Sequence, residues 1–263
     1  FTLFPYTTLF RSMSIKQQTA PQGIYWDISA PLSYNALFNF IIGNRGGGKS
    51  YGVKKHLIKR FINKQEEFVY LRRYKTEFKD EGDNSLETFF DDVQQDFPGH
   101  DFLVKGKKLY IDGHVAGYAM ALSTAKTKKS VPRPKVASIF YDEFIIDKGV
   151  YHYLHDEVTC FLELYETIAR MRDVQVWFVA NAITMTNPYF LYFNITLPYG
   201  KTISCKKDIL IEMVCKAEFV EVKKKTRFAK LIEGTQYAKY SIENDFLRDS
   251  PVFIEKKSGR CDY

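Results

Sequence analysis

Cysteines, long apolar runs and repeats are scarce or missing in this chain. Its 263 residues include four cysteines, none in a C-x-x-C pair, and they contain no internal repeat and no low-complexity tract. Nothing therefore indicates a disulfide framework, and a reducing cytoplasm fits the composition best. No stretch approaches the roughly 20 uninterrupted apolar residues that a membrane-spanning helix needs. We therefore expect no membrane partner.

An excess of negative charge is missing as well. The chain has 38 Lys and Arg against 31 Asp and Glu, a formal net charge of +7 and a pI near 9.0. This balance favours a polyanionic partner. With 45% apolar and 26% charged residues, the chain is expected to be globular with a sizeable buried core. One large domain with a small appendage is the natural division for this length.

The first twelve residues differ from the rest of the chain. Residues 3–12 resemble the in-frame translation of a widely used sequencing adapter. We therefore interpret residues 1–12 as an artefact and Met13 as the natural start. The alternative is a short apolar signal or anchor, but the segment lacks a basic n-region and a small-residue cleavage site.

A glycine-rich motif between two apolar segments is the most informative feature. It reads Gly43, Asn44, Arg45, Gly46, Gly47, Gly48, Lys49 and Ser50, the pattern G-x-x-x-x-G-K-[ST]. Residues 37–42 before it predict a buried strand, and the apolar spacing over 51–63 predicts a helix after it. In that context, glycines let backbone N–H groups surround phosphate oxygens, and the helix N-terminus favours their negative charge.

The residue types at the end of this motif indicate roles in nucleotide binding. Lys49 would reach the β- and γ-phosphates of ATP, and the Ser50 hydroxyl would hold Mg²⁺. We also count Tyr51, the next residue, among the nucleotide-binding residues. The competing interpretation is a glycine-rich turn with an incidental lysine, which the flanking strand and helix make less favourable.

A second apolar segment ends in two acids. Residues 136–141 are almost all apolar, as in a central parallel strand buried on both faces, and Asp142 and Glu143 follow. Ligands of open α/β sheets lie at the carboxyl ends of such strands. Asp142 would hold Mg²⁺ through its water shell, and Glu143 would polarise the attacking water. Alone, the acidic pair is also compatible with a solvated loop.

Strands and helices alternate along most of the chain. The patterns predict strands at 68–71, 102–104, 109–111, 115–122 and 174–180, and helices at 86–97 and 156–171. Repeated βα units with a phosphate-binding loop predict an α/β fold with a mainly parallel sheet and helices on both faces.

Several motifs in a fixed order carry a resemblance to a known family. They are the motif at 43–50, Arg72-Arg73-Tyr74-Lys75, segments 104–106, 110–113 and 116–117, Asp142-Glu143-Phe144-Ile145, and segments 181–182, 187–190, 225–228 and 252–256. Together they resemble the genome-packaging ATPases (encapsidation proteins) of small Bacillus-type podophages. The resemblance covers about residues 37–257, and no single motif carries it.

The resemblance implies a fold, a task and partners. The fold would be a P-loop NTPase of the additional-strand catalytic-glutamate type. The task would be to drive double-stranded DNA into an empty viral procapsid at the expense of ATP. The subunits would form a homo-oligomeric ring, a pentamer by resemblance, at the portal vertex in the host cytoplasm. Some members of the family also use a structural packaging RNA.

The resemblance also implies domain boundaries. We expect residues 13–220 to form the ATPase domain and residues 221–263 to begin a linker region. Family members continue into a C-terminal domain of nuclease-like fold that lacks nuclease activity. Since this chain ends where that domain should begin, we expect it to be a fragment.

Individual residues carry over where the local motif matches. Residues 166–172 resemble the segment that supplies a trans-acting arginine finger, with Arg170 at the matching position and Arg172 as a nearby competitor. A guanidinium at a neighbour's γ-phosphate would neutralise charge that develops in the transition state. The alternative is that both arginines form the basic last turn of a helix, where they favour the helix dipole.

Three further matches have simpler explanations that stay open. Lys75 resembles a lid or nucleotide-sensing lysine, and Lys129-Ser130 matches a functionally implicated pair, but surface lysines are usually just solvated. Asn181 follows a predicted strand where such ATPases place a polar sensor of the γ-phosphate. A buried asparagine that satisfies backbone groups is the competing interpretation.

The sequence thus predicts an ATP-driven translocase of double-stranded DNA. One alternative with the same chemistry is a cellular or plasmid helicase or partitioning ATPase. An alternative of another class is a nucleotide-regulated DNA-binding module that barely hydrolyses ATP. Glu143 beside Asp142 argues against the module, and the lack of recognisable helicase motifs argues against the helicase.

Overall fold

The computed structural model describes residues 23–78, 86–125, 133–146, 152–196 and 202–243. The expected adapter segment 1–12 and the pair Lys129-Ser130 lie outside the described residues. In the part of the chain that the structure covers, no helix is long and apolar enough to span a bilayer.

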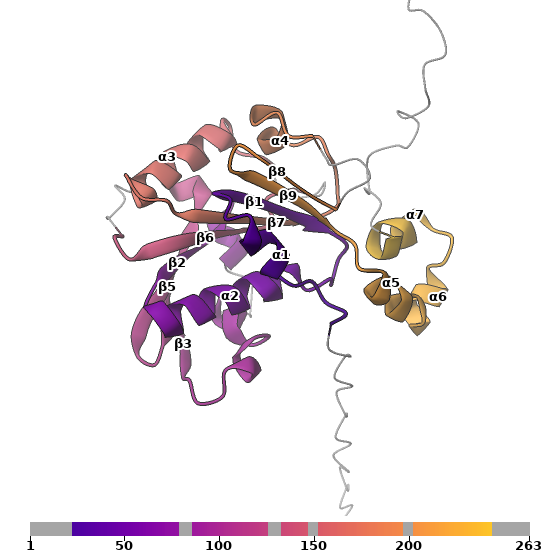
Figure 1. Cartoon of the computed structure of the whole chain (residues 1–263), viewed down its shortest axis with the longest axis horizontal. Coiled ribbons are helices and arrows are strands. Elements are labelled where there is room, and N and C mark those ends of the chain that lie inside the picture. The colour runs from indigo at the N-terminus through magenta and orange to yellow at the C-terminus, as the bar shows by residue number, and fades with distance from the viewer. Residues whose placement is uncertain (1–22, 79–85, 126–132, 147–151, 197–201, 244–263) are drawn as a thin grey trace, which may run out of the picture.

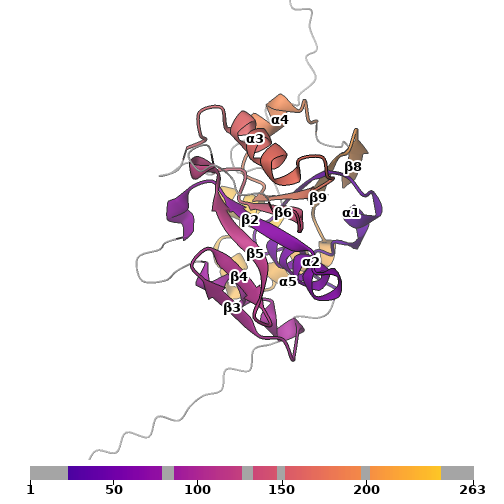
Figure 2. The same ribbon diagram turned by 90° about the vertical axis from the view of Figure 1, so that its left-hand side faces the viewer.

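The core of the fold is a nine-stranded sheet, counted over the described residues. Across the sheet the strands are β3 (Phe102–Lys105), β4 (Lys108–Ile111), β5 (His114–Ala121), β2 (Glu67–Arg72), β6 (Val136–Asp142), β7 (Gln175–Asn181), β1 (Phe38–Gly43), β9 (Ile209–Val214) and β8 (Ile203–Lys206). Neighbours from β5 to β9 run parallel, whereas β4 and β8 pair antiparallel with β5 and β9. Figure 2 shows β3 and β4 extending the sheet beside β5.

The position of β7 confirms the predicted fold class. β7 lies between β1, which enters the glycine-rich motif, and β6, which ends at Asp142. This inserted strand defines the additional-strand type of P-loop fold. In parallel register all three strands end at one edge of the sheet, where Gly43 pairs with Asn181.

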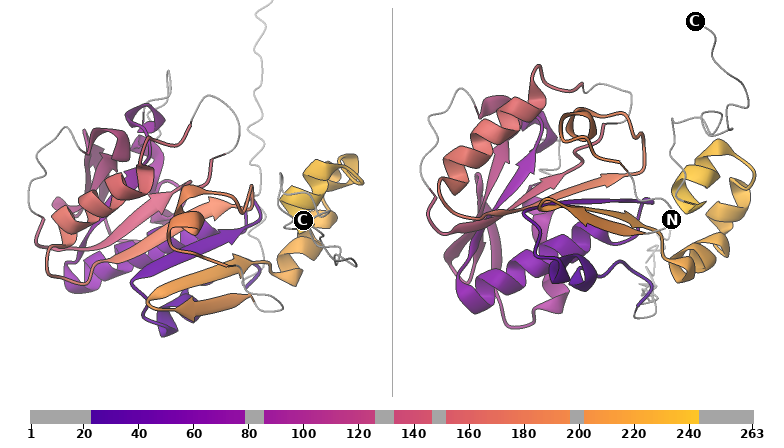
Figure 3. Two further views of the ribbon diagram at one scale, coloured as in Figure 1. Left: turned by 90° about the horizontal axis from the view of Figure 1, so that it is seen from above. Right: turned by 45° about the horizontal axis from the view of Figure 1, so that its top comes forward.

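Helices cover both faces of the sheet, as predicted (Figures 1 and 3). They are α1 (Ser29–Ser33), α2 (Lys49–Lys64), α3 (Glu157–Ala169), α4 (Pro188–Tyr192), α5 (Ala217–Lys224), α6 (Arg227–Leu231) and α7 (Gln236–Ala238), followed by a π-turn at Lys239–Glu243. The helices α2 and α3 lie on opposite faces, and α5, α6 and α7 form a separate helical unit beyond the end of β9 (Figure 3). The helical unit begins at Ala217, near the expected boundary at residue 220, and the domain division stays a prediction.

One predicted element is wrong. The segment 86–97 is not one amphipathic helix but two short 3-10 turns, Glu87–Phe90 and Gln94–Asp96. Phe89 and Phe90 are both buried, and their rings contact different partners, Tyr70 and Phe102. Both rings thus pack into the core from one 3-10 turn, which has three residues per turn. Tertiary packing therefore overrides the helical pattern.

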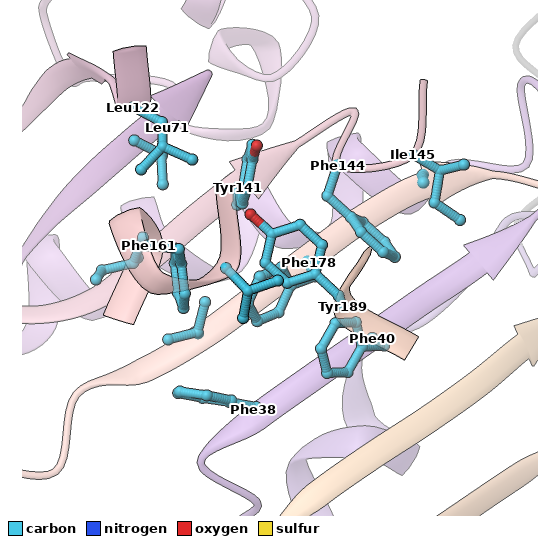
Figure 4. Packing of buried hydrophobic residues seen from close by; sticks show 14 of the residues in the cluster. Phe38, Phe40, Leu71, Leu122, Tyr141, Phe144, Ile145, Phe161, Phe178 and Tyr189 are labelled. Carbon is cyan, nitrogen blue, oxygen red and sulfur yellow. The ribbon is translucent and has the colours of Figure 1, made fainter. Parts of the chain in front are cut away.

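Aromatic side chains fill the space between the sheet and α3. Phe40 of β1 and Phe178 of β7 stack with centroids 4.3 Å apart, and Phe161 of α3 packs on Phe178 at 4.9 Å (Figure 4). Tyr141 and Tyr189 meet in the same cluster (Figure 4). Aromatic pairs in these geometries stabilise a core by about 0.5–1.5 kcal/mol beyond their burial. The cluster holds the three central strands in register behind the predicted site.

A buried ion pair lies at the top of this cluster. Arg73, just after β2, donates from Nε and Nη2 to the two carboxylate oxygens of Glu157, the first residue of α3, at 2.7 and 3.0 Å. The hydroxyls of Tyr141 and Tyr189 donate to the same carboxylate at 3.0 and 3.1 Å. Both charged residues are almost fully buried. Each carboxylate oxygen is thus satisfied, as a buried charge requires.

The same arginine holds the backbone that follows β6. Arg73 donates to the carbonyls of Glu143 and Phe144 at 3.3 and 2.6 Å. The buried pair therefore connects three segments: the end of β2, the turn after the two acids and the start of α3. It fixes the position of the turn that carries Glu143.

Glu157→Gln should lower the free energy of unfolding by about 3–5 kcal/mol, because Arg73 would be left as an uncompensated buried charge. The matched control is Glu166→Gln, an exposed position of the same helix, which should change stability by less than about 0.5 kcal/mol. Urea denaturation of both variants measures the difference. Equal stabilities for the two variants would contradict the role given to the buried pair.

Candidate nucleotide-binding site

The glycine-rich motif forms a tight turn from β1 into α2. Gly46 and Gly48 have φ of 81° and 86°, a region that residues with a Cβ rarely adopt. A Cβ on Gly47 would lie 2.8 Å from Asn44 Oδ1, so a side chain there would have to displace the buried Asn44 side chain. Among the described residues no side chain caps the start of α2. Its first N–H groups therefore stay available for an anion, and the turn fits the triphosphate of a nucleotide.

Lys49 lies under this turn, 5% exposed. Its Nζ donates to the carbonyls of Gly43 and Asn44 at 3.2 and 2.7 Å and to Asn181 Oδ1 at 3.4 Å. Burial lowers the pKa of Lys49 to about 8, while the charge of Asp142 opposes the shift. A buried ammonium with only neutral direct partners attracts an anion, because a phosphate would supply the missing counter-charge.

The predicted metal ligands lie together. Ser50 Oγ donates to Asp142 Oδ1 at 3.1 Å, although the two residues are far apart in sequence. Burial raises the pKa of Asp142, the charge of Arg72 opposes the rise and that of Glu143 adds to it. The described residues contain no cluster of three or more His, Cys, Asp or Glu that could hold a metal. A hydroxyl and one carboxylate suit Mg²⁺, which takes its other ligands from phosphates and water.

Glu143 occupies the turn immediately after β6. Its φ of 56° is uncommon for a residue with a side chain and indicates local strain, of the kind found at active sites. The side chain is 60% exposed, and its Oε2 accepts a hydrogen bond of 2.7 Å from Arg72 Nη2. Glu143 therefore reaches solvent beside Asp142, as a residue that polarises water would need to.

Arg72 is a functional candidate that the sequence analysis named without a role. It lies at the end of β2 and contacts three carboxylates: Glu77 at 2.8 Å, Asp142 at 3.6 Å and Glu143 at 2.7 Å. The sequence does contain a signal for such a role, because an arginine directly follows the predicted strand 68–71. In a parallel sheet the carboxyl end of this strand lies at the same edge as Asp142. What was missing was the order of the strands, which places β2 next to β6.

The other predicted nucleotide-binding residues lie at different places. Asn181 is at the site, beside Lys49. The side chain of Arg45 is exposed. The hydroxyl of Tyr51 donates to Asp96, away from the turn, so its side chain is occupied elsewhere. Lys75 is exposed in a 3-10 turn that follows Arg72 and Arg73.

Arg170 lies at the other end of the strands, on the side where β7 begins. It ends α3 and precedes β7, whose last residue is Asn181. Since seven strand residues rise about 20 Å, Arg170 cannot reach the turn of its own chain. It is exposed, has φ of 52°, and its side chain has no hydrogen bond or ion pair within the described part of the chain.

Arg172, the competing finger, has its guanidinium occupied. It donates to the carbonyls of Pro134 and Val136 at 2.8 and 2.7 Å and to those of Arg133 and Ile168 at 3.0 and 2.7 Å. A guanidinium bound to four carbonyls of its own chain is not presented to a neighbour. The geometry therefore favours Arg170 over Arg172 as a residue that acts outside its own subunit.

The helical unit contacts the back of the glycine-rich turn. Lys223 of α5 donates to the carbonyls of Arg45 and Ser241 at 2.7 and 2.6 Å. Asn44 Nδ2 also reaches the carbonyl of Ile242 at 3.5 Å. Burial lowers the pKa of Lys223, and the charge of Arg45 adds to the shift. The sequence analysis missed this contact, since within a basic stretch one lysine looks like the next.

Comparisons with known proteins agree with this geometry. Residues 21–263 match the family model described as "Podovirus DNA encapsidation protein (Gp16)". The chain is 42% identical over 238 residues to the DNA packaging protein of Bacillus phage phi29, covering 90% of this chain and 70% of that protein.

Two solved structures are also similar. The N-terminal domain of the DNA packaging ATPase from bacteriophage phi29 matches with a TM-score of 0.68 at 40% identity, over 74% of this chain and 98% of that chain. A subunit of the phi29 viral genome packaging motor assembly matches with a TM-score of 0.71 at 41% identity, over 90% of this chain and 71% of that chain. This chain belongs to the podovirus DNA encapsidation protein family.

Proposed function

We propose that this chain is the ATPase subunit of a viral genome-packaging motor, which hydrolyses Mg²⁺-bound ATP to move double-stranded DNA into a procapsid. The observation that carries the proposal is the meeting of Lys49, Ser50, Asp142 and Glu143 at one edge of the sheet. The relatives of this chain that support the proposal are named as a DNA packaging protein and as a viral genome packaging motor assembly.

The proposed division of labour follows from the contacts. The glycine-rich turn and Lys49 bind the β- and γ-phosphates, and Ser50 and Asp142 hold Mg²⁺. When bound, Mg²⁺ neutralises charge on the phosphates. Glu143 accepts a proton from the attacking water, for which its carboxylate must exchange Arg72 for that water. Asn181, bonded to Lys49, is placed to sense whether a γ-phosphate is present.

A ring of subunits is part of the proposal. One subunit cannot enclose a duplex, so head-to-tail contacts must close into a ring, with a pentamer as the form that the resemblance implies. In such a ring Arg170 of one subunit would approach the γ-phosphate of the next. The ring would sit at the portal of the procapsid in the host cytoplasm, with a packaging RNA where the motor uses one.

DNA would be gripped mainly through its phosphates, because a packaging motor must process any sequence. The net charge of +7 is consistent with such a partner. A duplex of mixed sequence is therefore a suitable probe for the test that follows.

ATP hydrolysis should be stimulated by duplex DNA only when a portal-bearing procapsid is also present. The reason is that translocation needs both a DNA duplex to move and a procapsid on which the motor is mounted. The measurement is phosphate release with DNA alone, with procapsid alone and with both. A helicase or partitioning ATPase would respond to DNA without the procapsid, and a binding module would turn over slowly in all three conditions. Either result would overturn the proposed function.

Lys49→Ala should abolish ATP binding, whereas Glu143→Gln should leave binding intact and slow hydrolysis by roughly 10²–10⁴-fold. The reason is that, in the proposed site, Lys49 binds the phosphates, whereas Glu143 acts on the attacking water and not on the phosphates. Calorimetric titration and single-turnover hydrolysis measure the two effects. Near-normal hydrolysis in Glu143→Gln would place the catalytic base elsewhere.

Arg170→Ala should be inactive alone but should partly recover activity when mixed with Glu143→Gln subunits. Loss of an arginine finger costs about 10³–10⁵ in rate, so recovery is easily detected. Mixed rings contain interfaces where an intact Glu143 site meets an intact Arg170. Co-assembly without recovery would show that Arg170 does not act across the interface.

A further inference from the structure

The site fixes the direction in which a bound nucleotide must lie. Asn181, at the end of β7, is the proposed sensor of the γ-phosphate. Glu143, proposed to activate the water that attacks this phosphate, directly follows β6. With strands about 4.8 Å apart, β6 lies about 10 Å to one side of β1. The phosphate chain starts at the turn after β1, so its γ end points toward β6. The ribose and base must then leave on the other side, toward β9.

Two segments border the turn on the side of β9. One is the stretch before α1, where the backbone N–H of Trp26 donates to the carbonyl of Gly47 at 2.9 Å and its indole donates to Glu212 of β9 at 2.9 Å. Gly52 leaves room for the Trp26 ring, since a Cβ there would lie 2.8 Å from it. The other segment is α5, which follows β9 directly. Figure 1 shows α5 beyond the carboxyl end of β9.

Each segment places an aromatic ring against the turn. Tyr25 packs on Gly48, where an added Cβ would lie 2.9 Å from Tyr25 Cβ. Phe219 of α5 lies 3.8 Å from the position of a Cβ on Gly46. The two rings are 6.0 Å apart and tilted by 49°, and Tyr25 is 43% exposed. Together they form an open aromatic corner beside the phosphate-binding turn.

We propose that the aromatic corner of Tyr25 and Phe219 binds the base of the nucleoside triphosphate. This inference rests on the proposed nucleotide site and adds the residues that hold the base. The tilt leaves no room for a base between the rings, so the base lies flat on one ring and edge-on to the other, an arrangement that aromatic groups favour. Stacking needs only a π-face, so the corner suits any base and selects by ring area.

The corner also connects two parts of the structure. Tyr25 is anchored to the sheet through its neighbour Trp26, whereas Phe219 belongs to the helical unit whose Lys223 holds the carbonyl of Arg45. A base that contacts both rings therefore bridges the sheet and the helical unit. The phosphates lie against the turn and the sheet, so the base is the part of the nucleotide that touches the helical unit directly.

The test compares two ligands, Mg-ATP and Mg-tripolyphosphate, which share the phosphates and differ in ribose and base. Affinities of the full chain are measured by calorimetric titration. In Phe219→Ala and Tyr25→Ala, ATP affinity should fall by about 5- to 150-fold, the range expected for loss of one base–aromatic stack. Tripolyphosphate affinity should not change. Phe219→Tyr should bind ATP as the parent chain does, because it keeps the aromatic face.

Matched controls come from the same chain. Phe228→Ala removes an aromatic ring that is 55% exposed on α6, and Tyr34→Ala removes one that is 46% exposed after α1. Both should leave the affinities for both ligands unchanged. If Phe219→Ala and Tyr25→Ala lose affinity for both ligands equally, or for neither, the aromatic corner does not bind the base. A parent chain that binds neither ligand would instead overturn the proposed nucleotide site.

Discussion

Parallel strand register is the constraint on which the rest of this structure depends. Because β1, β6 and β7 run in the same direction in one sheet, their carboxyl ends meet at one edge. That edge brings Gly43 beside Asn181 and puts Asp142 within hydrogen-bond distance of Ser50. The aromatic core beneath the strands holds this register, and the site follows from it. A slip of one residue in β6 would turn Asp142 to the other face of the sheet.

The direction of the strands also places Arg170 at the amino end of β7, away from the edge where Asn181 lies. Helix α3 returns the chain from the end of β6 to the start of β7, so Glu157 lies near the acids and Arg170 lies about 20 Å away. The buried pair of Arg73 and Glu157 ties the near end of α3 to the turn that carries Glu143. Helix α3 therefore connects the turn that carries Glu143 with Arg170, the residue proposed to act on a neighbouring subunit. Such a connection suits a motor whose subunits must hydrolyse ATP in a coordinated order.

Much of this could be predicted from the sequence, because the decisive signals are local. A glycine-rich turn between a strand and a helix indicates phosphate binding, and the acidic pair after an apolar strand becomes a strong signal only beside that turn. The fold class followed from this loop together with the repeated βα units. The resemblance supplied Arg170, and the structure added a reason to prefer it, since Arg172 is bound to its own chain.

The rest could not be predicted because it depends on which strands become neighbours. Arg72 and Arg73 acquire their partners only when β2 lies beside β6. Lys223 differs from the lysines around it only through the fold of the helical unit. The segment 86–97 has a helical pattern, but it forms two short 3-10 turns, from which Phe89 and Phe90 contact Tyr70 and Phe102. Long-range packing, rather than local preference, decided each of these features.

The central claim is that one subunit holds an incomplete site, which only a neighbour can complete. The most direct measurement is the rate of ATP hydrolysis per subunit across a range of protein concentrations, with the assembled fraction determined by light scattering in the same samples. We predict that the rate per subunit rises in proportion to the assembled fraction and is near zero for isolated subunits. A rate per subunit that stays constant while monomers become rings would contradict the account.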